Sequence, residues 1–215
     1  TRSGERRGVG GGSRLATLDL VARLGTPEQT PFLVNCLNDE DRDIRARAAA
    51  GIGRLKAADA VAELVASLAD PEWPVRAMAA KSLGDLAAIS AIPQLTKALE
   101  DREWWVRSNA ADALRKLGTP GLDALVALLG DPDRFARDQA LSMLESSGEL
   151  DRRLAALASS DSAERSTAEG LVRSLASRQS ADRLRDIRDR QQDATVRTAI
   201  DQLITAEPAT DEAAT

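Results

Sequence analysis

A segment that begins with aspartate recurs four times along this chain, starting at Asp39, Asp70, Asp101 and Asp131, so successive copies are 31, 31 and 30 residues apart. Each copy opens with acidic residues, continues with an apolar residue followed by arginine, and ends in a run rich in alanine or leucine. Self-similarity at a period of roughly 20–50 residues is the mark of a stacked repeat protein. The chain is therefore predicted to fold as a row of similar units that bury their apolar faces against one another.

Apolar residues within each unit have helical spacing. Val75, Ala79, Leu83 and Leu86 lie three or four positions apart, and the same spacing recurs one unit later. Hydrophobic residues make up 43% of the chain but aromatic residues only 2%, a composition that favours close helix packing over strands. We predict an all-α fold, a right-handed α-solenoid of about six stacked helix pairs.

The sequence LGTP occurs at 24–27 and again at 117–120, where it ends one helix and starts the next. This coincidence identifies Arg14–Leu24 as the second helix of a truncated first repeat. The first helices are predicted at Pro27–Leu37, Asp59–Leu68, Ser90–Leu99, Pro120–Leu129, Glu149–Leu157 and Gln179–Asp189. The second helices are predicted at Ile44–Leu55, Val75–Leu86, Val106–Leu117, Ala136–Ser146, Arg165–Leu175 and Thr195–Ile204.

Both ends of the chain differ in composition from the repeats. Residues 1–13 are rich in glycine and carry Arg2, Arg6 and Arg7, which indicates a flexible arm. Residues 207–215 (EPATDEAAT) indicate a disordered acidic tail. The solenoid is therefore assigned to residues 14–206.

An arginine stands at the start of every predicted second helix, and an aspartate stands six residues before the first four arginines. An acid in the turn can accept hydrogen bonds from the free N–H groups of the helix, and the arginine fork can bridge to an acid or to turn carbonyls. The pattern weakens in the last two units, where Ser159 and Gln191 replace the aspartate. We predict a structural ladder of Asp39, Arg45, Asp70, Arg76, Asp101, Arg107, Asp131 and Arg137.

The segments DPEWPVRAMAAKSLG at 70–84 and DREWWVRSNAADAL at 101–114 resemble the short bacterial HEAT-like repeats first named after phycobilisome lyases. The resemblance covers about residues 15–205 and is strongest over 39–147. It implies a helical solenoid in which the aspartate and arginine columns are structural. It does not imply a particular activity.

Histidine is absent from the chain, which removes His-based acid–base catalysis, Ser-His and Cys-His pairs, and nearly all familiar zinc sites. Cys36 falls inside a predicted helix and is interpreted as a small core residue. The acid run at 39–41 lacks the glycine-containing ligand pattern of a calcium loop. We therefore expect no catalytic residues, no metal and no cofactor, and a protein that is not an enzyme.

The formal net charge of −5 argues against a general nucleic-acid binder, and no run of eighteen apolar residues is present to span a membrane. A single cysteine favours a reducing compartment. We expect a cytoplasmic, bacterial protein with no nucleic-acid partner. The first residue is Thr1 and not methionine. One hypothesis is therefore that the chain is the cytoplasmic portion of a longer protein that is anchored in a membrane.

All three tryptophans fall at one place in the repeat, at Trp73, Trp104 and Trp105, and Phe135 follows one unit later. They are predicted to line successive turns as a ridge. Exposed aromatic residues on loops are typical binding hot spots. The alternative is that each ring packs on the turn of the next repeat. The stacking interpretation is favoured for Trp104. For Trp73 and Trp105 neither stacking nor binding is favoured over the other.

The predicted function is a non-catalytic scaffold that binds another protein. Alternatives are a bilin-lyase-like or enzyme-maturation subunit and a HEAT-like nucleic-acid-binding protein, which the acidic charge disfavours. The predicted partner-binding residues combine the ridge with one face of the second helices: Trp73, Trp105, Phe135, Arg47, Met78, Lys81, Asn109, Asp112 and Gln139.

Overall fold

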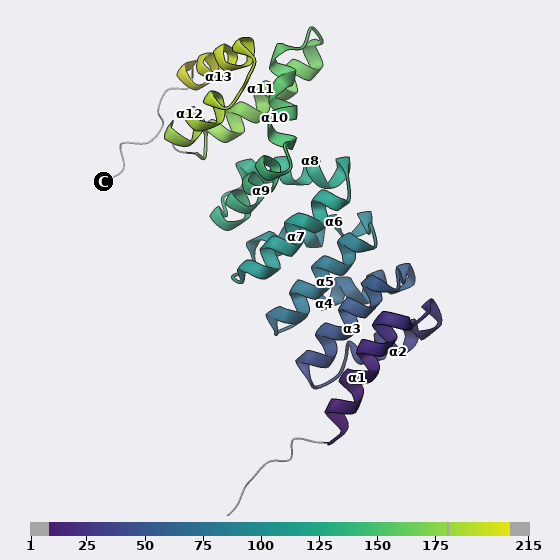
Figure 1. Ribbon diagram of the computed structural model, residues 1–215. Coiled ribbons are helices and arrows are strands. Elements are labelled where there is room, and N and C mark those ends of the chain that lie inside the picture. Colours follow the sequence, from purple (N-terminus) through teal and green to yellow (C-terminus); the bar gives the residue numbers. More distant parts are fainter. Residues whose placement is uncertain (1–8, 180, 207–215) are drawn as a thin grey trace, which may run out of the picture. The chain divides into compact units, whose positions relative to one another are not determined.

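The computed structural model describes residues 9–179 and 181–206, and these residues form helices joined by short turns, with no strand among them (Figure 1). The prediction of an all-α solenoid is confirmed. The predicted acidic tail at 207–215 and residues 1–8 of the predicted arm lie outside the described residues.

Helices alternate between two kinds, and we call the first helix of each repeat A and the second B. The A helices are short and mostly extended by 3-10 turns. They are α2 (Thr30–Cys36), α4 (Val61–Ser67), α6 (Ile92–Lys97), α8 (Thr119–Ala127), α10 (Glu149–Leu154) and α12 (Ala181–Asp189). The B helices are α1 (Val9–Leu24), α3 (Arg42–Arg54), α5 (Trp73–Asp85), α7 (Trp104–Lys116), α9 (Arg134–Ser146), α11 (Ser162–Ala176) and α13 (Ala194–Ala206).

The chain consists of two compact units, Thr1–Ala124 and Leu125–Thr215, and each is described by itself. In the first unit α1, α3, α5 and α7 lie side by side as one layer, and α2, α4 and α6 form a second layer behind them (Figure 1). In the second unit α10 packs against α9, and α13 packs against α11 and α12.

The helix starts differ from the prediction in a consistent way. The B helices after α1 begin one to three residues earlier than expected, because the acidic residue of the turn stands directly at the N-cap. Residues 9–13, predicted as part of a flexible arm, are helical in α1. Extending a helix that has already formed adds one hydrogen bond for each residue fixed, so the helix continues into a glycine-rich stretch that would not start one.

The core of the first unit follows the predicted column. Val75, Ala79 and Leu83 of α5 are fully buried, as are the equivalent residues of α7. The B helices approach one another closely at glycine. A Cβ atom on Gly84 would lie 2.6 Å from the Cα of Ala113, and one on Gly53 would lie 2.6 Å from the hydroxyl oxygen of Ser82. These glycines therefore set how near adjacent B helices can lie.

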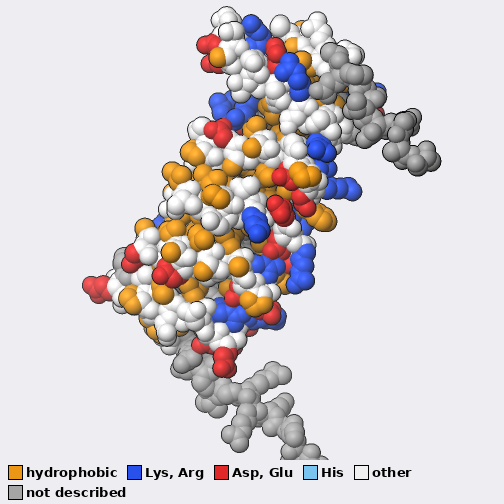
Figure 2. All heavy atoms as spheres, turned by 180° about the vertical axis from the view of Figure 1, so that it is seen from behind, with side chains coloured by type: hydrophobic (Ala, Val, Ile, Leu, Met, Phe, Trp, Pro, Cys, Tyr) orange, Lys and Arg blue, Asp and Glu red, His pale blue; other side chains and the backbone are white. Residues whose placement is uncertain are grey.

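Charged side chains are distributed unevenly. The view from behind in Figure 2 shows hydrophobic side chains spread over the middle of the first unit, and many acidic and basic ones along the right-hand edge. That edge corresponds to the left ends of α3, α5 and α7 in Figure 1, which are their N-terminal ends. The turns from A to B helices thus form a charged edge.

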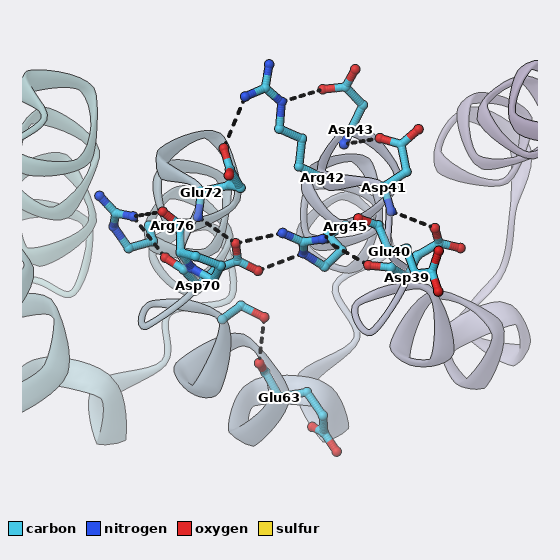
Figure 3. Close-up of polar contacts among 12 residues, drawn as sticks. Asp39, Glu40, Asp41, Arg42, Asp43, Arg45, Glu63, Asp70, Glu72 and Arg76 are labelled. Carbon is cyan, nitrogen blue, oxygen red and sulfur yellow. Dashed lines mark hydrogen bonds and ion pairs between the residues drawn. The ribbon is translucent and has the colours of Figure 1, made fainter. Parts of the chain in front are cut away.

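Successive repeats of the first unit are joined at this edge by the arginine ladder (Figure 3). Arg45 donates to both carboxylate oxygens of Asp70 in the next repeat, at 2.8 and 3.0 Å. Its third nitrogen donates to the Asp39 carbonyl of its own turn at 2.9 Å. Arg76 repeats this arrangement with Asp101, at 2.7 and 2.9 Å. Each fork therefore fixes its own turn and the following turn together.

The aspartates of the ladder also order their own turns. Asp70 accepts a hydrogen bond from the backbone N–H of Glu72 at 2.8 Å, and Asp101 accepts one from Glu103 at 2.9 Å. Burial would raise the pKa of the Asp101 carboxyl, but the hydrogen bonds from Arg76 and from the Glu103 N–H outweigh burial and hold the pKa below its ordinary value of 3.8. The pKa of Asp70 is lowered for the same reasons by Arg45 and Glu72.

The second unit keeps half of this arrangement. Arg137 donates to the carbonyls of Asp131 and Pro132 in its own turn, at 2.8 and 2.9 Å. Ser159 stands where the following repeat would supply the aspartate, and the Nε of Arg137 is buried without a hydrogen-bond partner among the described residues. The unit therefore retains the arginine but lacks its carboxylate.

We expect Asp101→Asn to lower the free energy of unfolding by about 2 kcal/mol, because the Arg76 side chain, only 11% exposed, loses a charged partner. Since the pKa of Asp101 is lower in the folded state, its contribution is complete above 3.8 and is lost as the pH falls through the folded value. Denaturant titrations at a series of pH values from neutral to below 3.8 measure both the loss of stability in the variant and its pH dependence. The control is Asp138→Asn, which removes an exposed pair with Arg134 and is expected to cost under about 0.5 kcal/mol. Equal losses would contradict the ladder's role.

Gly84→Ala is expected to destabilise the protein by about 1–2 kcal/mol, although alanine is the better helix former, because its Cβ would overlap Ala113. Gly170→Ala in α11 is the matched control. Nothing lies within 4 Å of a Cβ at Gly170, so this change should stabilise the protein by up to about 1 kcal/mol. Thermal unfolding of both variants gives the comparison, and stabilisation by both would mean that the helices can separate at no cost.

Ser159→Asp is expected to raise the free energy of unfolding by about 1 kcal/mol by giving Arg137 the carboxylate that Arg45 and Arg76 have. Ser159 accepts the N–H of Asp161 at 3.1 Å, a bond that aspartate can also accept. The uncharged control is Ser159→Asn, measured by the same denaturant titration. If the aspartate variant is the less stable, repulsion from Glu164, to which Ser159 now donates at 2.7 Å, outweighs the new pair.

Candidate partner-binding edge

Four large aromatic side chains lie in the first turns of B helices. Trp73 and Trp104 are the first residues of α5 and α7, and Trp105 and Phe135 are the second residues of α7 and α9. The sequence placed them on the connecting turns, and the earlier helix starts correct this. A helical first turn holds these rings on a rigid element. We call Trp73, Trp104 and Trp105, all in the first unit, the aromatic edge.

The rings of the aromatic edge are exposed. The exposed fraction is 39% for Trp73, 52% for Trp104 and 57% for Trp105, and Phe135 in the second unit is 53% exposed. The two rings of α7 contact each other edge to face, with centroids 4.8 Å apart. Burial between repeats would require much lower exposure. The exposure of Trp104 therefore does not fit the stacking interpretation that the sequence favoured for it, and partner binding by these rings stays a prediction.

Acidic residues stand beside these rings at the N-caps of α5 and α7. Asp41, Asp133 and Asp161 each cap their helix by accepting a backbone N–H. Glu72 and Glu103 occupy the same position without making a side-chain cap. The expectation that the turn acid caps each B helix is therefore corrected at the two tryptophan-bearing repeats. Their carboxylates remain part of the surface, with both side chains 39% exposed.

One of these carboxylates receives a basic side chain from the preceding repeat. Arg42, the first residue of α3, donates to Glu72 across the repeat boundary at 3.1 Å, as Figure 3 shows. Arg42 occupies the position that Trp73 occupies in α5 and Trp104 occupies in α7. The aromatic edge thus begins where this column changes from arginine to tryptophan.

The predicted B-helix face is partly used within the chain. Asn109 donates to the carbonyl of Ala77 in α5 at 2.9 Å, which joins two B helices. Arg47 pairs with Asp19 of α1 at 2.5 Å, and Asp112 pairs with Arg115 at 2.7 Å. These three residues stabilise contacts between or within helices, which is a sufficient reason for their presence.

The remaining residues of that face are less engaged. Met78 is half-buried, Lys81 is exposed, and Gln139 is half-buried in the second unit. Lys81 is therefore an exposed side chain of the predicted face, and it stands among residues that are committed elsewhere. This face carries less of the candidate site than the aromatic edge does.

Sequence reasoning missed an ionic network across the B layer. Lys116 of α7 pairs with Asp85 of α5 at 2.8 Å and with Asp112 of its own helix at 2.9 Å. The hydrogen bond that Lys116 donates to the Asp85 carboxylate raises the pKa of Lys116, against the smaller opposing effect of burial. The signal was the opposite charge of residues 85 and 116, which occupy one column 31 residues apart.

An open groove of about 390 Å³ runs between α4 and α6, lined by Val65, Leu68 and Lys97 among others.

No group of three or more His, Cys, Asp or Glu among the described residues could hold a metal ion. None of the described helices is long and apolar enough to cross a bilayer. Cys36 is buried.

Comparisons with known proteins agree with this architecture. A family model described as HEAT repeats matches residues 13–84 and 61–145, which together cover more than half of the 215-residue chain. No curated protein matches the sequence.

Several solved structures are similar to this chain, and the first described below shows the same fold. A chain of the complex of CpcE and CpcF of phycocyanin lyase from Nostoc sp. PCC7120 is 18% identical, with a TM-score of 0.52, over 96% of this chain and 97% of that chain. The archaeal HEAT-like repeats protein from Thermococcus onnurineus NA1 is 15% identical, with a TM-score of 0.43, over 89% of this chain and 95% of that one. On the repeats, the ladder and the family match, this chain belongs to the HEAT-repeat family.

Proposed function

We propose that this chain is a non-catalytic scaffold that binds another protein through its aromatic edge. The observation that carries the proposal is the exposure of Trp73, Trp104 and Trp105 at the same end of two successive B helices. Tryptophan is enriched among the residues that supply most of the binding energy at protein interfaces. Large exposed rings on rigid elements lose little conformational entropy on binding.

A protein partner fits this edge better than a nucleic acid does. The chain has a net charge of −5, and Glu72 and Glu103 flank the rings. Nucleic-acid binding relies on cations that neutralise phosphates. Of the arginines near these turns, Arg45 and Arg76 are already committed to aspartates, and Arg102 is exposed but has Glu103 beside it. The buried single cysteine is consistent with action in a reducing cytoplasm.

A lyase-like or enzyme-maturation role is the second candidate. The observation in its favour is the similarity to a chain of the phycocyanin lyase complex. At 18% identity this similarity extends to the fold alone. Co-expression with a bilin followed by absorbance spectroscopy separates the two candidates. Bound pigment would support the second candidate, whereas colourless protein that still captures a partner would support the scaffold.

Trp73→Ala combined with Trp105→Ala is expected to abolish partner capture while changing the melting temperature little, because both rings are already substantially exposed. The measurement is affinity capture from a native extract with quantitative mass spectrometry, alongside thermal unfolding. Ile89→Ala is the matched control, since Ile89 is a large apolar residue that is 56% exposed and precedes α6. Undiminished capture together with a clearly lowered melting temperature would identify the tryptophans as stacking residues only.

A further inference from the structure

The aromatic edge contains a position where a basic side chain is present in one repeat and missing from the next. Arg42 of α3 reaches Glu72, thirty residues later, at 3.1 Å. The equivalent pair one repeat on is Trp73 and Glu103. Because tryptophan cannot pair with a carboxylate as arginine does, this interface has the acid without the matching cation.

The ion pair of Glu103 is a weak one. It is a 3.8 Å contact with the adjacent residue Arg102, whose side chain is 81% exposed. The Glu103 side chain makes no helix cap. A carboxylate in this condition can accept a strong hydrogen bond from a guanidinium or ammonium group at little cost, because it gives up little to do so.

Trp73 supplies the second half of a cation site. An indole face attracts a Lys or Arg side chain placed within about 6 Å of its centre. The Arg42–Glu72 pair shows that the first residue of one B helix lies within side-chain reach of the N-cap of the next. Trp73 and Glu103 have that same relation in the repeat.

We propose that the aromatic edge binds a Lys- or Arg-bearing extended segment of a partner protein, with one basic side chain seated on Trp73 and paired with Glu103. This rests on the proposed scaffold function and specifies the chemistry of the partner. Two acids of the adjoining turns, half-buried Glu72 and exposed Glu100, add negative charge that complements a basic segment. A second copy of this acidic chain is the poorer match.

The repeat spacing suggests the form of the segment. Packed helices lie about 8–10 Å apart. A polyproline II segment advances about 3.1 Å per residue with three residues per turn, so every third side chain faces the same way at intervals of about 9.3 Å. Basic residues at every third position would therefore match successive repeats, with one paired with Glu103 and the next facing Glu72, which Arg42 already occupies.

The test is calorimetric titration of the full chain with a synthetic peptide in which arginine alternates with two prolines, four times over, with both ends blocked. A peptide with glutamate in place of arginine is the charge control. We expect the arginine peptide to bind, and the binding to weaken as salt is added. No binding of the arginine peptide, or equal binding of the glutamate peptide, overturns the proposal.

Three variants locate the site, and unfolding measurements confirm that each is folded. Glu103→Gln keeps the shape and removes the charge, and should weaken binding about fivefold. Trp73→Arg should recreate the Arg42–Glu72 pair with Glu103 and so abolish peptide binding. Arg42→Trp should release Glu72, extend the edge by one repeat and strengthen binding. Unchanged affinity in Glu103→Gln or Trp73→Arg places the peptide elsewhere and overturns the assignment.

The experiments distinguish a failure of the scaffold function from a failure of the basic-segment assignment. If partner capture from the extract depends on Trp73 and Trp105 but the arginine peptide does not bind, the scaffold stands and the basic partner is rejected. If neither partner capture nor peptide binding depends on the tryptophans, both the scaffold function and the basic partner are rejected. If the chain instead self-associates in a Trp73-dependent manner in sedimentation experiments, a second copy is the occupant and the basic-segment proposal is overturned.

Discussion

The structure of the first unit depends on the close approach of neighbouring B helices. No single helix pair can bury its apolar face, so each must lie against the next. Gly84 against Ala113 and Gly53 against Ser82 show how near the helices come, since a single added Cβ atom would overlap the neighbour. Small residues at these points let larger ones such as Leu83 and Leu114 fill the space between layers completely.

The arginine ladder adds direction to this packing. Hydrophobic contacts alone would allow adjacent repeats to slide, because burial is non-directional. A fork that bonds at once to its own turn carbonyls and to both oxygens of the next aspartate defines one relative position. The ladder thus holds the turns in line, and the aromatic edge lies in the first helical turns that follow them.

The second unit shows how the ladder can change. Gln191 stands in the aspartate column, is buried, and donates to Asp151 at 2.7 Å and to the Ile187 carbonyl at 3.1 Å. Arg165 still donates to the carbonyl of Ser159 in its own turn, at 2.9 Å. The contact within each turn persists where the contact between turns is lost, so the arginine orders its own turn without the aspartate of the next repeat.

The sequence by itself determined the repeat, the helix pairs and the aspartate and arginine columns, because each depends on residue type at fixed spacing. It did not determine which acids cap and which remain on the surface, since Asp41 and Glu72 differ by one methylene and occupy the same column. It also did not show that Asn109 bonds to Ala77, or that the rings at Trp104 and Trp105 are exposed. Those properties depend on distances between repeats and on where each helix begins, and only the tertiary structure decides them.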